Sequence, residues 1–299
     1  MKNIIIILNY NDFETTQKYI EQIINYKSID KMIVVDNASP DLSFEKLKGY
    51  ASEKIDVIYN PKNEGYAKGN NFGINYVNSK YTAENIIISN PDIIVSDESI
   101  NEMTKFLDNN SEYASVTGLI RNLNDDIVKN YAWKQPSYLD IMFSSSLVLN
   151  KIYNTLNPEY MFYKKPTVLQ GHKDVEVLSG CFFMIRNDVL KEIKNFDEST
   201  FLYHEENLLF KKINNLGFKN AVLLPEKIVH FEGISVAKNY GSYLKKARFM
   251  HDSATIYLTK ALNISPLQLK IFNIIFKLGT IEKYFYIKYI KSRSNKNEK

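Results

Sequence analysis

The sequence has little capacity for disulfides and no long apolar run. Its single cysteine, Cys181, has no second cysteine with which to form an internal disulfide. No stretch reaches the roughly 18 to 20 uncharged apolar residues that span a bilayer, and the best candidate, residues 271–276, is far shorter. The first residues lead directly into a strand-like segment, without a basic leader or a small-residue cleavage site. We therefore expect a cytoplasmic protein without a membrane-spanning helix.

Internal repeats and low-complexity linkers are also absent, while the 299 residues are 44% hydrophobic and 13% aromatic. This composition is typical of a globular protein with one large domain and room for an appendage. Charge is unevenly distributed, because residues 238–299 contain 13 lysines and arginines against 3 acids, whereas the preceding residues are net acidic. A basic tail on an acidic body indicates an anionic surface contacted by one end of the chain, and no nucleic acid.

Short β-branched runs alternate with amphipathic stretches in the first third of the chain. The runs lie at 4–8, 32–35, 56–59 and 86–89. Nearly continuous apolar strands separated by helices predict a doubly wound α/β sheet, mostly parallel and covered on both faces. Further strands are predicted at 114–120 and 175–185, followed by a helix ending at Gly217 and a helical pattern after Ile234.

Polar or glycine-containing loops follow each of the first four predicted strands. They occupy residues 9–12, 34–41, 60–74 and 89–92. Any one of them is ordinary turn chemistry, but ligands of open parallel sheets bind beyond the carboxyl ends of the strands. The third loop, NEGYAKGNNFGI (63–74), lacks the GxGxxG spacing of dinucleotide folds. We expect its small residues to allow close packing and to let Lys68 and Asn71 approach a ligand.

The segment IIISNPDIIV (86–95) interrupts a β-branched run with three polar or rigid residues. Pro91 has no N–H for the strand ladder and holds Asn90 in an extended conformation, so Asp92 is fixed at the strand end. Asp92 is either a turn former or a ligand for Mg2+ or Mn2+ on phosphates. His230, in IVHFEGIS (228–235), is either a structural histidine or a further ligand of that metal, and imidazole suits Mn2+ better than Mg2+.

A second acidic motif begins the predicted helix before Gly217. Leu209, Ile213 and Leu216 mark its apolar stripe, and Glu205 and Glu206 fall on either side of it. Carboxylates at a helix N-terminus are stabilised by the helix dipole, which is one interpretation. The other is a general base in a partly desolvated site, with its pKa adjusted by burial and by its neighbour.

Taken together, these motifs resemble the family 2 glycosyltransferases of the GT-A fold, particularly the rhamnosyltransferase-like branch that builds bacterial surface polysaccharides such as capsule. The matching segments are NYN (9–11), VVDNAS (34–39), residues 63–74, NPD (90–92), residues 179–203, the acids at 205 and 206, and HFEGIS (230–235). The resemblance implies that Tyr10 and Asp36 contact the nucleoside base and that Lys68 lies near the base or phosphates. It also implies that Asp92 and His230 hold a metal on the diphosphate and that Glu206 is the catalytic base.

Two positions depart from the family pattern. The usual Asp-x-Asp metal motif has Asn90 at its first position, and the second acid that normally follows the acidic pair is replaced by Leu208. Glu205 is consequently kept as the alternative base. The residues that we expect to bind the donor are Tyr10, Asn11, Asp36, Lys68, Asn71, Asn90 and Asp92.

The sequence thus predicts a Rossmann-like GT-A domain over residues 1–236 and a basic, aromatic-rich helical tail over 237–299. Within the domain, 1–95 forms the nucleotide-binding half and 96–236 the acceptor-binding half. The expected reaction is inverting transfer of a hexosyl group from a UDP- or dTDP-sugar to a saccharide or lipid-linked saccharide, assisted by Mn2+ or Mg2+. The tail either packs on the body or a second subunit, as in a homodimer, or lies on the inner face of the cell membrane.

Two other functions are kept as alternatives. A sugar nucleotidyltransferase should carry a glycine-rich phosphate loop after the first strand, and residues 9–16 contain no glycine. A binding or scaffold subunit that has lost catalysis would account for Asn90 and Leu208, but retention of Asp92, Glu206 and His230 argues against it.

Overall fold

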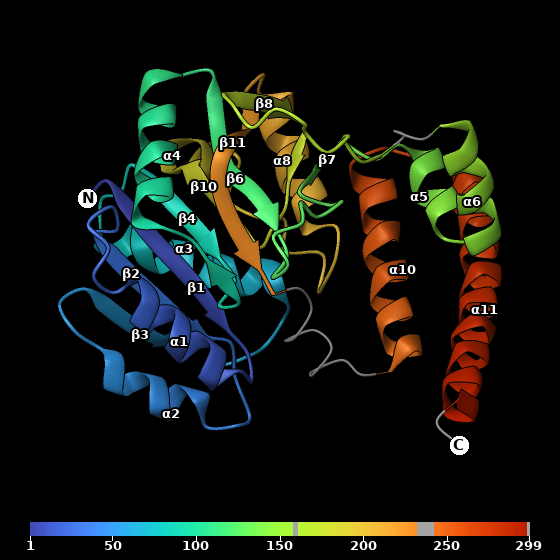
Figure 1. Cartoon of the computed structure of the whole chain (residues 1–299), viewed down its shortest axis with the longest axis horizontal. Helices are drawn as coiled ribbons and strands as arrows, with labels where there is room; N and C mark the ends of the chain where they lie inside the picture. Colours follow the sequence, from blue (N-terminus) through green and yellow to red (C-terminus); the bar gives the residue numbers. More distant parts are fainter. Residues whose placement is uncertain (158–160, 232–241, 298–299) are drawn as a thin grey trace.

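The computed structural model describes residues 1–157, 161–231 and 242–297, with side chains as far as residue 290. An α/β body carries a group of helices on one side (Figure 1). The strands are β1 (Asn3–Asn9), β2 (Lys31–Asp36), β3 (Ile55–Tyr59), β4 (Asn85–Ser89), β5 (Ile93–Ile94), β6 (Tyr113–Arg121), β7 (Ala132–Trp133), β8 (His172–Val175), β9 (Val177–Leu178), β10 (Phe182–Arg186) and β11 (Lys219–His230).

The helices fall into two groups, those of the α/β body and those on its side, which we call the helical extension. The body has α1 (Phe13–Ile23), α2 (Ser43–Leu47), a 3-10 turn (Lys48–Tyr50), α3 (Tyr66–Lys80), α4 (Asp97–Asn109), α7 (Asn187–Glu192) and α8 (Glu205–Asn215). The helices on the side are α5 (Tyr138–Ser144), α6 (Leu147–Leu156), α10 (Tyr243–Lys260) and α11 (Pro266–Asn297).

The main sheet has the strand order β3-β2-β1-β4-β10-β6-β11-β5, with β8 beside β11. Strands β1 to β4 pair in parallel, β10 runs antiparallel to β4 and β6, and β6 pairs in parallel with β11. The predicted α/β fold with a mostly parallel sheet and C-terminal helices is confirmed. Because β10 is antiparallel, its first residues lie at the carboxyl edge of β4, where Asn90 donates its N–H to the carbonyl of Cys181 at 2.8 Å.

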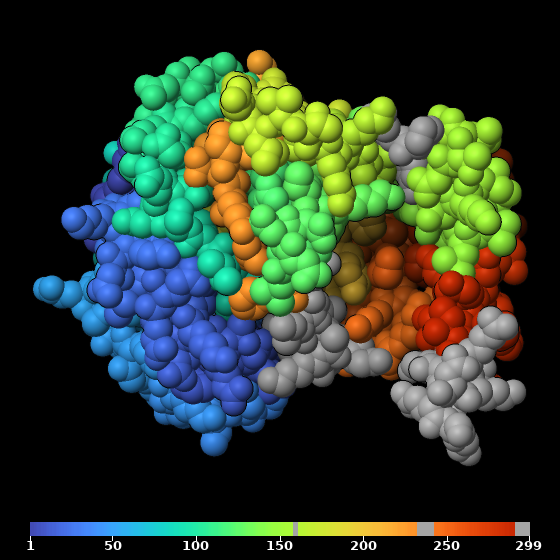
Figure 2. Space-filling view, viewed as in Figure 1, coloured from blue at the N-terminus to red at the C-terminus, as the bar shows by residue number. Residues whose placement is uncertain are grey.

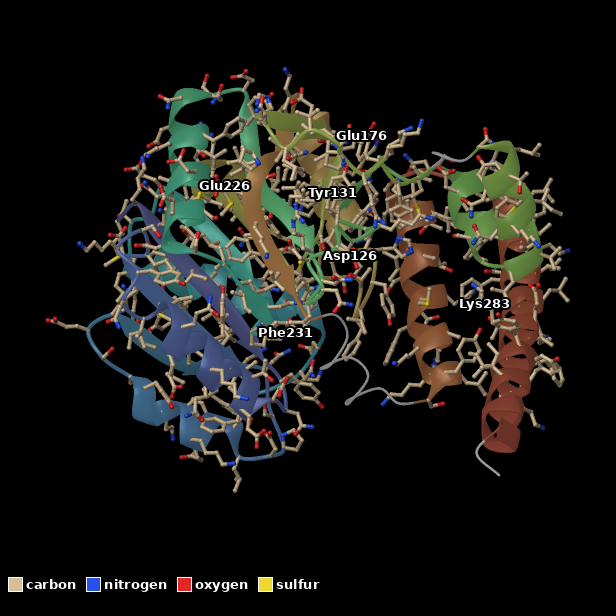
Figure 3. The ribbon with its side chains drawn as sticks, viewed as in Figure 1. Asp126, Tyr131, Glu176, Glu226, Phe231 and Lys283 are labelled. Atoms are coloured by element: carbon tan, nitrogen blue, oxygen red, sulfur yellow. The ribbon has the colours of Figure 1, made fainter. Side chains whose placement is uncertain are left out.

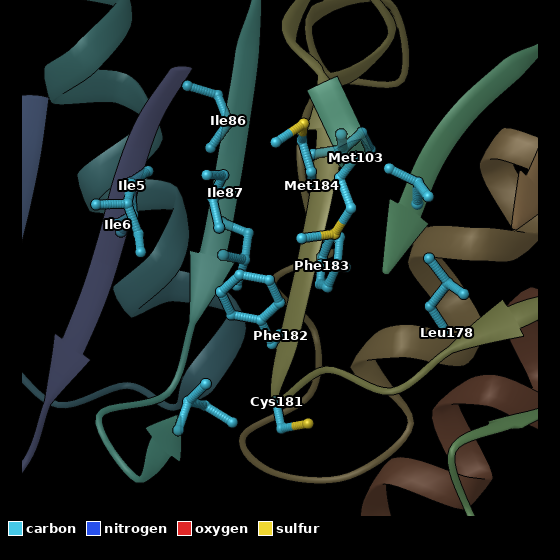
Figure 4. Packing of buried hydrophobic residues seen from close by; sticks show 14 of the residues in the cluster. Ile5, Ile6, Ile86, Ile87, Met103, Leu178, Cys181, Phe182, Phe183 and Met184 are labelled. Carbon is cyan, nitrogen blue, oxygen red and sulfur yellow. The ribbon is translucent and has the colours of Figure 1, made fainter. Parts of the chain in front are cut away.

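The apolar strands are buried on both faces, as their composition predicts. Figure 4 shows Ile86 and Ile87 of β4 beside Phe182, Phe183 and Met184 of β10 in this core. On α3, a Cβ at Gly69 would approach Leu8 and one at Gly73 would approach Ile6, each to 2.7 Å. The expected close packing through the small residues of α3 is therefore confirmed.

One detail of the predicted elements is wrong. Residues 175–185 do not form one strand, because the chain leaves β9 at Leu178, turns at Gly180 and joins the main sheet only at Phe182. The short β9 pairs instead with β7 in a separate two-stranded sheet. In the tail, the helical pattern predicted after Ile234 is seen as α10 and α11.

The side helices have their own small core. It joins Leu208 of α8 to α5, α10 and α11 through Ile141, Ala254, Tyr257, Leu258 and Phe272. Leu208, which replaces an acid of the family pattern, is thus a buried contact to the extension. The described tail helices contact the body through this core, which is one of the alternatives given for the tail, whereas the predicted domain boundary at 236/237 lies outside the described residues. None of the described helices combines the length and hydropathy needed to cross a membrane.

Candidate active site

The Asn-Pro-Asp interruption brings Asp92 to His230. After β4 ends, the chain crosses to the far edge of the sheet and pairs Ile93 of β5 with His230 of β11. The N–H of Phe231 donates to the carbonyl of Asp92 at 3.1 Å, which fixes the register. As a result, the Asp92 Oδ1 to His230 Nε2 distance is 3.3 Å. The two residues predicted to hold a metal are 138 positions apart in sequence and adjacent in space.

Asp92 is buried and His230 is partly buried. Only 3% of Asp92 is exposed. Burial lowers the pKa of His230, but Cys181 and Asp92 together raise that pKa to about 10. Without a metal, His230 is therefore protonated and forms an ion pair with Asp92. Since a metal binds the neutral imidazole, metal binding here must release a proton.

The chemistry of the pair fits a divalent cation shared with a ligand. The described residues contain no cluster of three or more His, Cys, Asp or Glu side chains arranged to hold a metal. One carboxylate and one imidazole leave several positions for diphosphate oxygens and water, which is how Mg2+ and Mn2+ are usually held at phosphate sites. Asp92 and His230 are the residues that would hold such an ion.

The acidic pair is presented by an unusual turn. Tyr203 and His204 both have left-handed backbone conformations, with φ of 78° and 66°, immediately before α8 begins at Glu205. Such residues are costly unless the surroundings hold them, and they concentrate at functional sites. His204 is held by stacking on Tyr257 of α10, with ring centroids 5.4 Å apart. The extension therefore supports the turn that places both glutamates.

Glu205 and Glu206 differ in their surroundings. Burial and the charge of Glu206 raise the pKa of Glu205 well above its usual range, and its buried Oε1 has no hydrogen-bond partner among the described residues. Burial also raises the pKa of Glu206, but the backbone N–H groups of Glu206 and Gly180 stabilise its charged form. Two adjacent buried carboxylates do not both ionise readily. The stronger rise in the pKa of Glu205 favours a proton on Glu205, and the assignment of Glu206 as the base stays a prediction.

Gly180 allows a close approach to Glu206. A Cβ at Gly180 would overlap the side chain of Glu206, so a larger residue here would displace that carboxylate. Tyr66, at the start of α3, donates its hydroxyl to the carbonyl of Gly180 at 2.6 Å. Sequence reasoning assigned no role to Tyr66 or Gly180, although both lie in motifs that the resemblance singled out.

One cavity of about 550 Å3 is lined by several of these groups, and its volume is typical of small-molecule sites. Asn90, Glu205, Glu206 and His230 are part of its lining, whereas Asp92 reaches it only through its contact with His230. Figure 2 shows the surface hollowed between the α/β body and α10, beside this site. The lining also includes Trp133, the only tryptophan, whose indole N–H donates to Asn207 Oδ1 at 2.7 Å. The sequence analysis gave Trp133 no role, and its uniqueness was the one available signal.

The predicted base-contacting residues lie at the carboxyl ends of β1 and β2. Asn9 and Asp36 pair in the sheet, and Asp36 Oδ2 accepts from Asn9 Nδ2 at 2.7 Å while its Oδ1 accepts from the N–H of Ser39 at 3.0 Å. The N–H of Asn11, a left-handed residue next to Tyr10, donates to Ser39 Oγ at 2.8 Å. Asp36 therefore joins the first two loops, and its contact with a base, like those of Tyr10 and Asn11, stays a prediction.

The two predicted donor residues of α3 have different environments. Lys68 lies in the first turns of α3, is partly exposed, and pairs with Glu64 at 3.1 Å. Asn71 is buried, and its amide nitrogen donates to the Phe196 carbonyl at 3.1 Å and to Glu198 Oε1 at 2.8 Å. Asn71 thus ties α3 to the loop before α8. Lys68 is the more accessible candidate for a phosphate contact.

The order of motifs along this site has a counterpart in a known family. The sequence profile of "Glycosyl transferase family 2" matches residues 4–194, more than half of the chain. The chain belongs to this family. Over 202 residues it is 27% identical to the low-salt glycan biosynthesis hexosyltransferase Agl10 of Haloferax volcanii, covering 68% of this chain and 58% of that one. It is 24% identical over 218 residues to rhamnosyltransferase WbbL of Escherichia coli, covering 72% of this chain and 78% of that one.

Solved structures share the fold of this family 2 member. The mannosyltransferase PcManGT from Pyrobaculum calidifontis, in complex with GDP-Man and Mn2+, superposes with a TM-score of 0.57 at 13% identity, covering 93% of this chain and 69% of that one. GalNAc-T7 with UDP, GalNAc and Mn2+ superposes with a TM-score of 0.60 at 12% identity, covering 92% of this chain and 55% of that one. S. aureus TarS residues 1–349 with UDP-GlcNAc superposes with a TM-score of 0.53 at 15% identity, covering 92% of this chain and 70% of that one. At these identities the likeness shows the fold alone.

Proposed function

We propose that this family 2 member is an inverting hexosyltransferase that moves a sugar from a nucleotide-sugar to a hydroxyl of a saccharide or lipid-linked saccharide. The observation that carries the proposal is the shared cavity, which places Glu206 and His230, the partner of Asp92, on one surface. A base and a diphosphate-binding pair on opposite elements are what a single displacement needs. The nucleotide-sugar ligands of the structural neighbours, GDP-Man and UDP-GlcNAc, support the donor class.

In this mechanism Glu206 accepts the proton of the acceptor hydroxyl as that oxygen attacks the anomeric carbon. A raised pKa brings the carboxylate closer to the operating pH, which improves general-base catalysis. The anomeric configuration inverts because there is one displacement. One acting carboxylate is enough, unlike the pair that glycosidases use on opposite sides of the bond.

The leaving group is a nucleoside diphosphate, on which negative charge grows. A divalent cation on Asp92 and His230 would offset that charge, and the Mn2+ in two structural neighbours supports this choice. Lys68 supplies a further positive charge if it exchanges Glu64 for a phosphate oxygen. Asn90 presents a neutral amide where the family has a carboxylate, so the protein contributes less charge to the metal than the usual motif.

Hydrolysis and transfer across a panel of UDP-, dTDP- and GDP-sugars, with Mn2+ and Mg2+ in turn, would test the proposal. We expect slow hydrolysis of one donor in the absence of acceptor. If a nucleotide-sugar bound but neither hydrolysis nor transfer occurred with any acceptor pool, the alternative of a catalytically lost binding subunit would replace the proposal. Leu208 does not favour that alternative, because it is a buried contact to the extension.

We also propose that the protein is cytoplasmic and contacts an anionic membrane through the outer face of α11. Six apolar side chains on that face are 40 to 67% exposed, namely Leu267, Ile271, Ile274, Leu278, Ile281 and Phe285. Exposed Lys270, Lys277 and Lys288 lie along one edge of this stripe on a helical wheel. The one acid of α11 as far as Ile290, Glu282, is bound to the start of α6.

The lysines beside the apolar stripe help to decide whether a second copy of α11 or a membrane contacts it. Two copies of α11 packed face to face would bring lysines together with no carboxylate on either helix to pair with them. An anionic lipid surface accepts both the apolar stripe and the lysines, as in amphipathic helices that lie in the membrane interface. The charge pattern therefore favours a membrane over a homodimer through this face.

A further inference from the structure

The cavity continues past the glutamates into the helical extension. There it is lined by the end of α5, the inner face of α10 and the middle of α11, through Ser144, Ser145, Tyr243, Ala247, Met250, Ala254, Phe276, Thr280 and Lys283. Most of these side chains are apolar or bear a single hydroxyl. Lys283 is the one cation among them. Figure 3 shows Lys283 between α10 and α11, well away from Phe231 at the end of β11.

Lys283 has an incomplete set of partners. Its Nζ donates one hydrogen bond, to the carbonyl of Ser144 at 3.0 Å, whereas an ammonium has three donors. No described carboxylate pairs with it, because the neighbouring Glu282 points to α6 and accepts from Ser146, Leu147 and Val148. Burial lowers the pKa of Lys283. A partly buried cation with unused donors is unfavourable unless an anion joins it.

We propose that Lys283 binds a phosphate of the acceptor, so that this end of the cavity takes a saccharide linked through phosphate to a hydrocarbon chain. The inference rests on the proposed function, since it places the acceptor hydroxyl at Glu206. The hydrocarbon would lie against Met250, Ala254 and Phe276. Tyr243 and Thr280 line the same region, but their hydroxyls already donate to the carbonyls of Thr280 and Phe276, so Lys283 is the donor that the proposal relies on.

A purely structural role for Lys283 makes different predictions. Ser144 is the last residue of α5, and a cation there interacts favourably with the helix dipole. If capping were the whole role, replacing Lys283 would lower thermal stability without changing which ligands the cavity prefers. Ligand preference, and not stability, is therefore the quantity to measure.

Trp133 provides the readout, because the only tryptophan lines the same cavity. We would titrate the full-length protein with decyl phosphate, decanol and inorganic phosphate while recording tryptophan fluorescence. The wild type should bind decyl phosphate at least about tenfold more tightly than either of the others, which corresponds to about 1.4 kcal/mol. A wild type that binds decanol as tightly as decyl phosphate would overturn the proposal without any variant.

Variants locate the phosphate. Lys283→Met should abolish the preference for decyl phosphate over decanol, Lys283→Arg should keep most of it, and Lys105→Met, an exposed lysine on α4 of the body, should leave it unchanged. An unchanged preference in Lys283→Met would overturn the assignment. If inorganic phosphate bound as tightly as decyl phosphate, the hydrocarbon part would be wrong and the site would be one for free phosphate.

Donor hydrolysis without acceptor separates this inference from the proposed function. Donor hydrolysis by the wild type should proceed whether or not Lys283 binds a phosphate, because water replaces the acceptor in that reaction. Loss of decyl phosphate preference with intact hydrolysis supports both proposals. Absence of hydrolysis in every variant and in the wild type would count against the transferase, while the phosphate preference would still be judged on its own titration.

Discussion

Residues 1–95 and the helical extension differ in how their side chains reach the candidate site. In residues 1–95, most candidate side chains lie at or just after the end of a strand, and parallel pairing brings the strand ends to one edge of the sheet. In the extension, side chains reach the cavity from helix faces that also pack against one another. The first arrangement is set by strand register, and the second by the shapes of buried side chains.

The two regions meet at α8. Glu206 faces Gly180 on the sheet side, while the turn before it is held by stacking of His204 on Tyr257 of α10. Substitutions at Glu206 should therefore change the rate of transfer, whereas substitutions in the extension should change the stability of the turn that positions Glu206.

The largest effect is expected from Glu206→Gln, which removes the base without changing the shape of the side chain. Transfer should fall by roughly 10²- to 10⁴-fold, the usual contribution of general acid-base catalysis, whereas donor affinity should change little. Steady-state transfer and donor titration would measure both. The control is Glu205→Gln, which mimics a carboxyl that is already protonated and should retain most activity. A variant Glu206→Gln with more than about a tenth of wild-type turnover would move the role to Glu205.

The pH dependence of transfer should carry the same signature. The base acts in its charged form, so activity is complete above the pKa of Glu206 and is lost as pH falls through it. Since burial raises that pKa above the ordinary 4.5, the acid limb should appear at a higher pH than for an exposed glutamate. The rate should fall about tenfold per pH unit below the pKa. The residual activity of Glu206→Gln should show no such limb, and an acid limb at or below pH 4.5 in the wild type would contradict the assignment.

The sequence was sufficient for the first region because its signals are local. Pro91 ends β4 wherever the sheet lies, and polar loops after apolar strands predict a ligand edge. The meeting of Asp92 with His230 was one of two alternatives before the resemblance favoured it, because β5–β11 pairing is a long-range contact. The roles of Trp133, Gly180 and Lys283 were not predictable, since each arises from packing between elements distant in sequence. The two left-handed residues before α8 likewise have no local signature, as neither is glycine.

Stability should distinguish the two faces of α11. Phe272 is fully buried in the core of the extension, and Phe272→Ala should lower the free energy of unfolding by about 3 to 5 kcal/mol. The same substitution at Phe285, which is 62% exposed on the opposite face, should change it by no more than about 0.5 kcal/mol. Urea unfolding of both variants would measure the difference. Equal effects would mean that the outer face is covered in the protein in solution.

Asp92→Ala should weaken donor binding by at least the roughly tenfold loss that even outer-shell changes cause at metal sites. The effect should be present with Mn2+ and small in chelator, because Asp92 acts through the metal. Affinity for Mn2+ should also rise with pH, since His230 must lose a proton to bind it. Isothermal titration with and without chelator would test this. Equal donor binding by both proteins under both conditions would remove Asp92 from the metal site.

The smallest effects are expected at single lysines on the outer face of α11. The full-length protein should co-sediment with vesicles containing phosphatidylserine, and salt should release it. Replacing Lys270, Lys277 or Lys288 by Gln should weaken this binding by about 1 kcal/mol each, with little change in donor hydrolysis.

Truncation at Ser265 is a less specific test of the same face, because it also removes Phe272 from the core of the extension. The matched control is Lys105→Gln, an exposed lysine on α4 of the body whose loss should leave vesicle binding unchanged. Vesicle binding that is unaffected by salt and by replacement of each of the three lysines would show that the apolar stripe is sufficient for binding. Failure to bind, together with a dimer in light scattering that Leu278→Asp dissociates, would assign the stripe to a second copy of the chain. Electrostatic contact is the only one of the three that requires both the stripe and the lysines on its edge.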